Sequence, residues 1–121
     1  MILVDTSVWI EHLRAADPNL QGLLAEGRVR AHPFVIGELA CGTMPRREEV
    51  LALLGKLPAL DVVSHREAMQ LLSTGRLEGR GLGWVDVHLV ASALVSGDAF
   101  WTLDLRLATA ARALRVAEFR P

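Results

Sequence analysis

Four acidic residues stand among apolar neighbours at widely separated points of the chain, and we call them the acidic quartet: Asp5, Glu38, Asp86 and Asp104. A buried carboxylate is costly when it is isolated, and several together repel one another and take up protons unless a cation neutralises them. Carboxylate oxygens, without a cysteine cluster or a histidine pair at ligand spacing, favour a hard cation such as Mg²⁺ or Mn²⁺. The acidic quartet is therefore a candidate set of metal ligands and catalytic residues.

Each acid also has a simpler structural explanation when it is considered alone. Asp86 and Asp104 could cap the helices that follow them, and Asp5 could be a turn residue at the end of a strand. Glu38 is harder to explain in this way, because it is the only charged residue of an apolar helix and glutamate is rarely buried without a partner. The joint pattern, at strand ends and in apolar runs, favours one shared site.

Two apolar runs that each lead to an aspartate are expected to position the quartet. Residues 1–5 and 99–103 have no polar alternation, which is typical of strands buried on both faces of a parallel sheet. If both strands are parallel and central, Asp5 and Asp104 emerge at the same edge of the sheet. Ligands of α/β proteins bind at this edge.

The remaining pattern predicts an α/β fold, a three-layer α/β/α domain with a mostly parallel central sheet of four to five strands. Residues 1–121 are expected to form a single domain. Ser7 is expected to cap the first helix, and the glycine-rich residues 75–83 to form a mobile loop. Further helices are predicted at 18–26, 33–41, 46–57, from 65, at 86–96 and 104–114, and further strands at 28–32, 60–63 and 115–117.

Length and composition limit the classes of protein to consider. The chain has 121 residues, of which 51% are hydrophobic, so one folded core is expected and disorder is not. No apolar run is long enough to span a membrane, and the N-terminal run lacks the features of a signal peptide. We therefore expect a cytoplasmic protein without membrane association. The single cysteine, Cys41, excludes an internal disulfide and a cysteine-rich zinc site.

The net charge of −1 means that any binding of nucleic acid must come from a local basic patch. The basic residues are almost all arginine, for which a bias of the coding sequence is the simpler explanation and affinity for phosphate the alternative. Candidate RNA contacts are Arg106, just after Asp104, and Trp84, just before Asp86, whose ring could stack on a base. A solvated role for Arg106 and a packing role for Trp84 remain open.

The chain resembles the PIN-domain family, and within it the VapC-type ribonuclease toxins of VapBC toxin–antitoxin pairs. The resemblance rests on short motifs that are specific in combination and in order: Leu3-Val4-Asp5-Thr6-Ser7 with Trp9-Ile10, Glu38-Leu39 with Gly42, Asp86 with Ala91 and Ala93, and Thr102-Leu103-Asp104 with Leu107. These motifs span the chain, and its length fits a toxin that consists of one domain.

The resemblance implies a metal-dependent endoribonuclease, the toxin component of a type II toxin–antitoxin system. In such an enzyme the acidic quartet holds one or two Mg²⁺ or Mn²⁺ ions, and a metal-activated water hydrolyses an RNA phosphodiester bond. Thr6 or Ser7 matches the position whose hydroxyl supports the site. The implied partners are an RNA substrate, whose single-stranded loops are the natural target, a cognate antitoxin protein, and a second copy of the chain in a homodimer.

Three alternatives compete with this interpretation. A receiver domain would need an acidic pair after the first strand and a late lysine, but Thr6 follows Asp5 and Lys56 is the only lysine. A phosphatase of the haloacid dehalogenase type would need a second aspartate where Ser7 stands. The strongest alternative is a catalytically inactive PIN-like module that binds RNA or protein, although the complete quartet argues against it.

Overall fold

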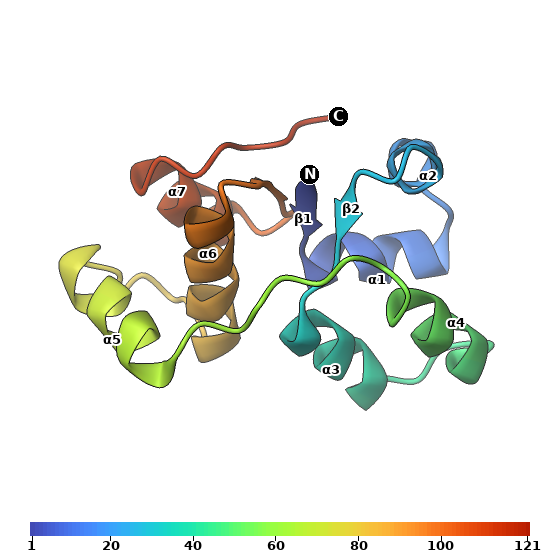
Figure 1. The fold of residues 1–121 in the computed structure, drawn as a ribbon, viewed down its shortest axis with the longest axis horizontal. Helices are drawn as coiled ribbons and strands as arrows, with labels where there is room; N and C mark the ends of the chain where they lie inside the picture. The colour runs from blue at the N-terminus through green and yellow to red at the C-terminus, as the bar shows by residue number, and fades with distance from the viewer.

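A three-stranded parallel sheet lies at the centre of the computed structural model, which describes residues 1–121. The strand order is β2-β1-β3, so β1 (Ile2–Val4) is central between β2 (Val29–Arg30) and β3 (Ala99–Trp101). All three residues of β1 are buried, as its uninterrupted apolar sequence predicts. In Figure 1 the helices of the N-terminal half of the chain lie on the side of β2, and those of the C-terminal half lie on the other side.

The predicted α/β class is confirmed, but the sheet has fewer strands than the four to five expected. Residues 60–63 and 115–117 form no strands, and single parallel bridges, Ala31 to Ala59 and Phe100 to Glu118, mark where the sheet would continue. Arg115 has a φ of 62°, which a strand does not allow at the start of residues 115–117. At the other edge the pairing is limited to two hydrogen bonds, from the N–H of Ala31 to the Pro58 carbonyl and from the N–H of Leu60 to the Ala31 carbonyl.

Seven helices surround the sheet. They are α1 (Thr6–Arg14), α2 (Pro18–Ala25), α3 (Pro33–Cys41), α4 (Arg47–Leu54), α5 (His65–Thr74), α6 (Trp84–Ser96) and α7 (Leu105–Ala113). Asp17 and Asp104 cap α2 and α7 through their side chains. None of them combines the length and apolar character needed to cross a lipid bilayer. The prediction that Ser7 caps α1 is wrong, because Asp5 occupies the cap position and the Ser7 hydroxyl bonds to the Asp5 carboxylate instead.

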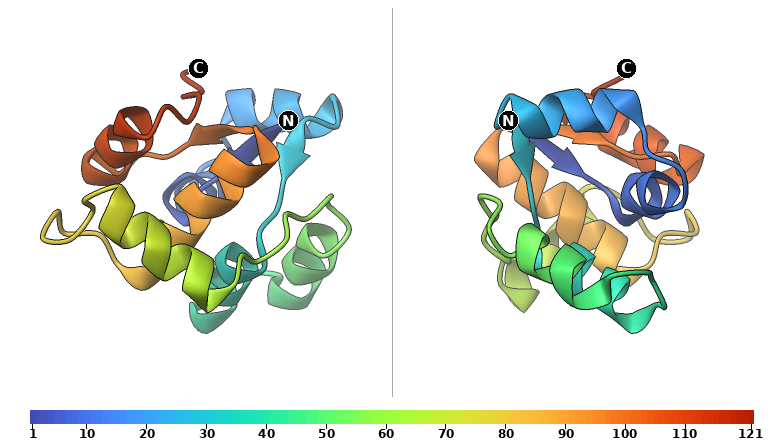
Figure 2. Two further views of the ribbon diagram at one scale, coloured as in Figure 1. Left: turned by 60° about the vertical axis from the view of Figure 1, so that its left-hand side comes forward. Right: turned by 90° about the vertical axis from the view of Figure 1, so that its right-hand side faces the viewer.

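Helix α6 is the central helix of the molecule, with seven consecutive buried residues from Val87 to Ala93. Its residues Leu89, Val90 and Ala93 belong to one cluster of 20 buried apolar residues that also contains the whole of β1. Helix α5 packs against α6, and the left view of Figure 2 shows the two helices next to each other. This packing fixes the N-terminal end of α6, which carries Asp86, relative to the sheet.

A buried hydrogen-bond chain connects α3 to α6. The N–H of Phe34 donates to Nδ1 of His32 (3.0 Å), so the ring proton sits on Nε2, which lies 3.1 Å from the hydroxyl oxygen of Ser92. The Ser92 hydroxyl in turn donates to the carbonyl oxygen of Asp61 (3.0 Å). His32 is fully buried and is the N-cap of α3, so this chain positions the helix that carries Glu38.

Replacing Ser92 by alanine is expected to lower the free energy of unfolding by about 1–3 kcal/mol, because the buried N–H of His32 then loses its acceptor. Chemical denaturation at neutral pH measures this change. Ser73→Ala is the matched control, since Ser73 is exposed on α5 and its side chain makes no hydrogen bond, so about 0.5 kcal/mol or less is expected. Equal losses of unfolding free energy for the two substitutions would contradict the stabilising role of the hydrogen-bond chain from His32 through Ser92 to Asp61.

Candidate active site

Asp5 lies at the carboxyl end of β1 and is held there by two hydroxyl groups. Its N–H donates to the carbonyl oxygen of Trp101 (2.9 Å), which extends the pairing of β1 with β3. Its Oδ2 accepts from Ser7 Oγ at 2.6 Å and from Thr102 Oγ1 at 2.7 Å. The residue is only 5% exposed, and no protein donor reaches Oδ1. One oxygen therefore fixes the side chain and the other stays free.

Asp104 lies at the same edge of the sheet as Asp5, at the start of α7. Its Oδ1 caps the helix by accepting from the N–H groups of Arg106 (2.9 Å) and Leu107 (3.3 Å). Its own N–H donates to Oγ1 of Thr102, the hydroxyl that donates to Asp5. The capping explanation is thus correct for one oxygen of Asp104, and it leaves Oδ2 without a protein donor.

Asp86 approaches the same edge from α6. The helix begins two residues earlier than predicted, at Trp84, and Oδ2 of Asp86 accepts a hydrogen bond from the N–H of the N-cap residue Gly83 (2.9 Å). Burial raises the pKa of the Asp86 carboxyl, the Gly83 N–H opposes that rise, and the nearby charges of Asp5 and Asp104 add to it. The carboxylates of Asp5 and Asp104 are thus close enough to Asp86 for their charges to act on its carboxyl.

Glu38 joins the group through Thr6. The Thr6 hydroxyl donates to Oε1 of Glu38 at 2.7 Å, which ties α3 to the residue that follows Asp5. The expectation that Glu38 is buried is wrong, because α3 turns Val35 and Leu39 toward the core and leaves Glu38 exposed.

The four carboxylates have the same hydrogen-bonding arrangement. In each of them one oxygen accepts a hydrogen bond from the protein, and the other oxygen has no protein donor. No three acidic, histidine or cysteine side chains are arranged to hold one ion jointly. Mg²⁺ does not require such a cage, since it usually keeps several waters and uses one or two carboxylates. An all-oxygen donor set whose charges repel one another therefore fits a hard divalent cation.

Sequence reasoning missed Thr102 as a site residue, although its hydroxyl contacts both Asp5 and the N–H of Asp104. The available signal was a threonine directly after a buried strand and two residues before the aspartate. Ser7 also has a second role, since its Oγ accepts from the N–H of Leu103 at 3.0 Å. The two hydroxyl residues connect the ends of β1 and β3.

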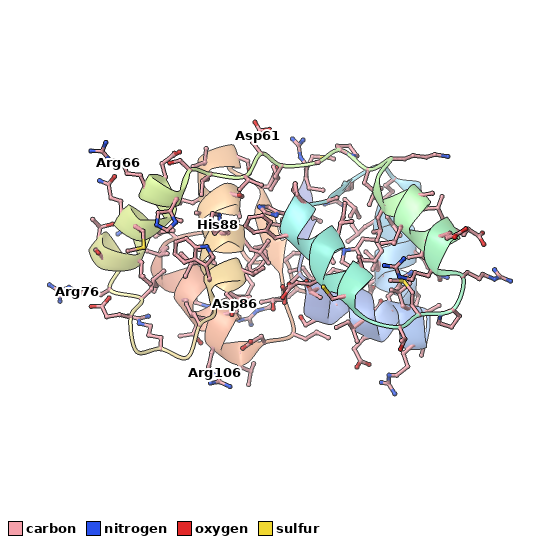
Figure 3. All side chains as sticks on the ribbon, turned by 90° about the horizontal axis from the view of Figure 1, so that it is seen from below. Asp61, Arg66, Arg76, Asp86, His88 and Arg106 are labelled. Atoms are coloured by element: carbon pink, nitrogen blue, oxygen red, sulfur yellow. The ribbon has the colours of Figure 1, made fainter.

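The two candidate RNA contacts lie in different surroundings. Trp84 is 39% exposed, but its ring packs against His65 and His88, with centroids 5.2 and 4.8 Å away. This packing joins α5 to α6 whether or not the ring also meets a base. Arg106 is exposed, and its guanidinium lies against the backbone of Gly81 in the glycine-rich segment. Figure 3 shows Asp86 and Arg106 on the same side of the molecule.

Asp98, a further acid close to Asp104 in the sequence, lies at the opposite end of β3 from Asp104. Its carboxylate is buried and lies 3.1 Å from Nε of Arg30 and 3.7 Å from the N-terminal amine of Met1. Asp98 therefore serves an ion-pair cluster away from the acidic quartet.

Comparison with known proteins gives a consistent family. The model of the PIN domain matches residues 2–113. The chain is 54% identical over 111 residues to Ribonuclease VapC32 from two strains of Mycobacterium tuberculosis, with 91% of this chain and 90% of that protein covered.

Two solved structures have a similar fold. Both are under 25% identical to this chain in sequence, so they show the fold alone. The crystal structure of FitAcB from Neisseria gonorrhoeae has a TM-score of 0.69 and 23% identity, covering 100% of this chain and 98% of that chain. FitAB bound to an IR36 DNA fragment has a TM-score of 0.67 and 22% identity, with 98% and 94% covered.

Proposed function

We propose that this chain, which belongs to the PIN-domain family, is a metal-dependent endoribonuclease and the toxin of a toxin–antitoxin pair. The observation that carries the proposal is the convergence of acids with free oxygens at one edge of the sheet. The 54% identity to a protein named Ribonuclease VapC32 supports RNA as the substrate class. The whole chain, residues 1–121, would act as one PIN-like unit in the cytoplasm, where its RNA substrate is found.

In this proposal the acidic quartet holds Mg²⁺ or Mn²⁺ through the oxygens that have no protein donor. When bound, such a cation neutralises charge on the phosphate and makes water a usable nucleophile near neutral pH. The hydroxyls of Ser7 and Thr102 orient the Asp5 carboxylate, and Gly83 orients that of Asp86. Hydrolysis adds the water oxygen to phosphorus and breaks one P–O ester bond, whose oxygen leaves with a proton.

The proposal includes two protein partners, an antitoxin and a second copy of the chain. An apolar groove of about 540 Å³ opens beside Glu38 and could receive an antitoxin segment. Ile10, Leu13, Leu39 and Met44 supply its apolar lining, and Ile10 is exposed on α1. Contiguous apolar surface of this kind is typical of sites that bind other proteins.

The proposal is tested by incubating the purified protein with total RNA in Mg²⁺, in Mn²⁺ and in a chelator. Discrete fragments are expected with either metal, none in the chelator, and recovery when metal is restored. Asp86→Asn is expected to remove the activity, because asparagine keeps an acceptor for Gly83 but loses the charge. Cleavage that survives chelation would refute the metal mechanism, and binding without cleavage would favour the inactive PIN-like module.

Thr102→Val is expected to reduce the cleavage rate about 10- to 100-fold at saturating metal. The substitution keeps the shape of the side chain and removes the hydroxyl that holds Asp5 and Asp104, and loss of such supporting contacts has effects of this size. Steady-state cleavage of a defined RNA measures the change. Thr74→Val is the control, because the Thr74 hydroxyl bonds only within α5, to the Gln70 carbonyl. A wild-type rate for Thr102→Val would show that this hydroxyl does not support the site.

A further inference from the structure

Two arginines without ion-pair partners border a groove beside the acidic quartet. Arg80, Leu105, Arg106 and Thr109 line this groove, which has a volume of about 380 Å³ and lies between the glycine-rich segment and the start of α7. Neither Arg80 nor Arg106 contacts a carboxylate, whereas Arg30 and Arg112 are paired with Asp98 and Glu118. Two exposed cations thus remain available to a ligand.

The backbone of Arg106 is anchored at the start of α7. Its N–H donates to Oδ1 of Asp104 at 2.9 Å, which fixes the backbone of Arg106 relative to that acid. The side chain of Arg106 lies on Gly81, where an added Cβ would come within 2.6 Å of Nη1 and 3.2 Å of Cδ. Gly81 has a φ of 76°, a backbone conformation that favours glycine, and the missing Cβ leaves room for the Arg106 side chain.

Arg106 therefore bridges the segments that lead to two members of the quartet. Gly81 lies five positions before Asp86, and Arg106 lies two positions after Asp104. The guanidinium makes no ion pair with either aspartate, so its charge is not used to neutralise them. Leu105, which is 82% exposed, adds an apolar surface beside the two cations.

We propose that Arg106, together with Arg80, binds the RNA phosphate next to the one that is cleaved. The planar guanidinium can form two parallel hydrogen bonds to phosphate oxygens, and its position over Gly81 directs it toward the segment that leads to Asp86. The net charge of the chain is −1, so attraction of a polyanion toward four carboxylates requires local cations of this kind. This inference rests on the proposed function and names the residues that place the substrate.

The test is binding of a short fluorescein-labelled single-stranded RNA, followed by anisotropy in a chelator so that no cleavage occurs. Arg106→Ala is expected to raise Kd about tenfold and to reduce the slope of log Kd against log salt by about 0.7, the value for one phosphate contact on a single strand. Arg80→Ala should act in the same direction. Arg106→Lys should keep the salt slope and lose part of the affinity.

Arg66→Ala is the matched control, because it removes one exposed and unpaired arginine from α5. Figure 3 shows Arg66 on the other side of the molecule from Arg106. The inference is overturned if Arg106→Ala and Arg66→Ala have equal Kd values and equal salt slopes, or if the wild-type protein does not bind the RNA. Cleavage by the wild-type protein in Mg²⁺ is measured separately, so failure of the nuclease proposal and failure of the phosphate contact give different results.

Discussion

Replacing Asp5 by asparagine is expected to lower the rate of RNA cleavage on the order of a thousandfold, equivalent to about 4 kcal/mol of transition-state stabilisation. Asparagine can still accept hydrogen bonds from Ser7 and Thr102 through one oxygen, so the end of β1 keeps its anchors. The other oxygen becomes an amide nitrogen, which is no ligand for a hard cation. The rate is measured with a defined RNA at saturating Mg²⁺.

Asp61→Asn is the matched control for this experiment. Asp61 is exposed, its carboxylate makes no hydrogen bond, and Figure 3 places it well away from Asp86. The control should cleave RNA at the wild-type rate. The assignment of Asp5 fails if Asp5→Asn retains normal activity, and a loss of activity with a loss of circular dichroism signal would show a folding defect instead.

Acidification is expected to destabilise the fold through His32. Burial, and secondarily the charge of His88, lower the pKa of His32 from 6.5 to about 4. Below pH 6.5 the imidazole of His32 therefore takes up a proton in the unfolded chain, whereas in the folded chain it stays neutral until about pH 4. The part of the folding stability that depends on a neutral His32 is fully present above pH 6.5. It is lost as the pH falls toward 4, with a total near 3 kcal/mol. The geometry agrees, because a protonated Nδ1 would face the N–H of Phe34.

The control for His32 is the variant His32→Asn, which keeps an acceptor for the α3 cap and cannot titrate. Unfolding by urea at several pH values compares the two proteins. Between pH 6.5 and 4 the wild-type stability should fall more steeply, by up to about 1.4 kcal/mol per pH unit. Parallel curves would contradict the assignment to His32. His88, whose pKa burial also lowers, contributes in the same direction in both proteins.

Local sequence patterns predicted the strands that end in Asp5 and Asp104, because an apolar run followed by an acid is a local feature. They also predicted α3 with its bounds, from Pro33 to the glycine after Cys41. The same patterns predicted edge strands that do not form, because strand pairing at the edge of a sheet depends on partners far away in the chain. Residues 60–63 have strand composition, yet only a single bridge at Ala59 forms.

The contacts that organise the candidate site could not be predicted from periodicity. The hydroxyl of Thr102 reaches Asp5 across 97 positions, and that of Thr6 reaches Glu38 across 32. Such pairs follow from strand register and helix docking, which a single sequence does not specify. The exposure of Glu38 shows the same limit, because the face that α3 buries is decided by its neighbours. The residue types therefore indicated a carboxylate metal site, whereas the hydroxyl groups that hydrogen-bond to these carboxylates were found only in the folded structure.

The central claim is that the acidic quartet binds a divalent cation, and calorimetric titration with Mn²⁺ tests it most directly. Saturable binding to the wild-type protein is expected, with an affinity that Asp61→Asn preserves. Asp5→Asn should weaken binding at least tenfold, since it removes a ligand rather than a supporting contact. Equal Mn²⁺ binding by the wild type and Asp5→Asn, or no binding by either at millimolar metal, would contradict the claim.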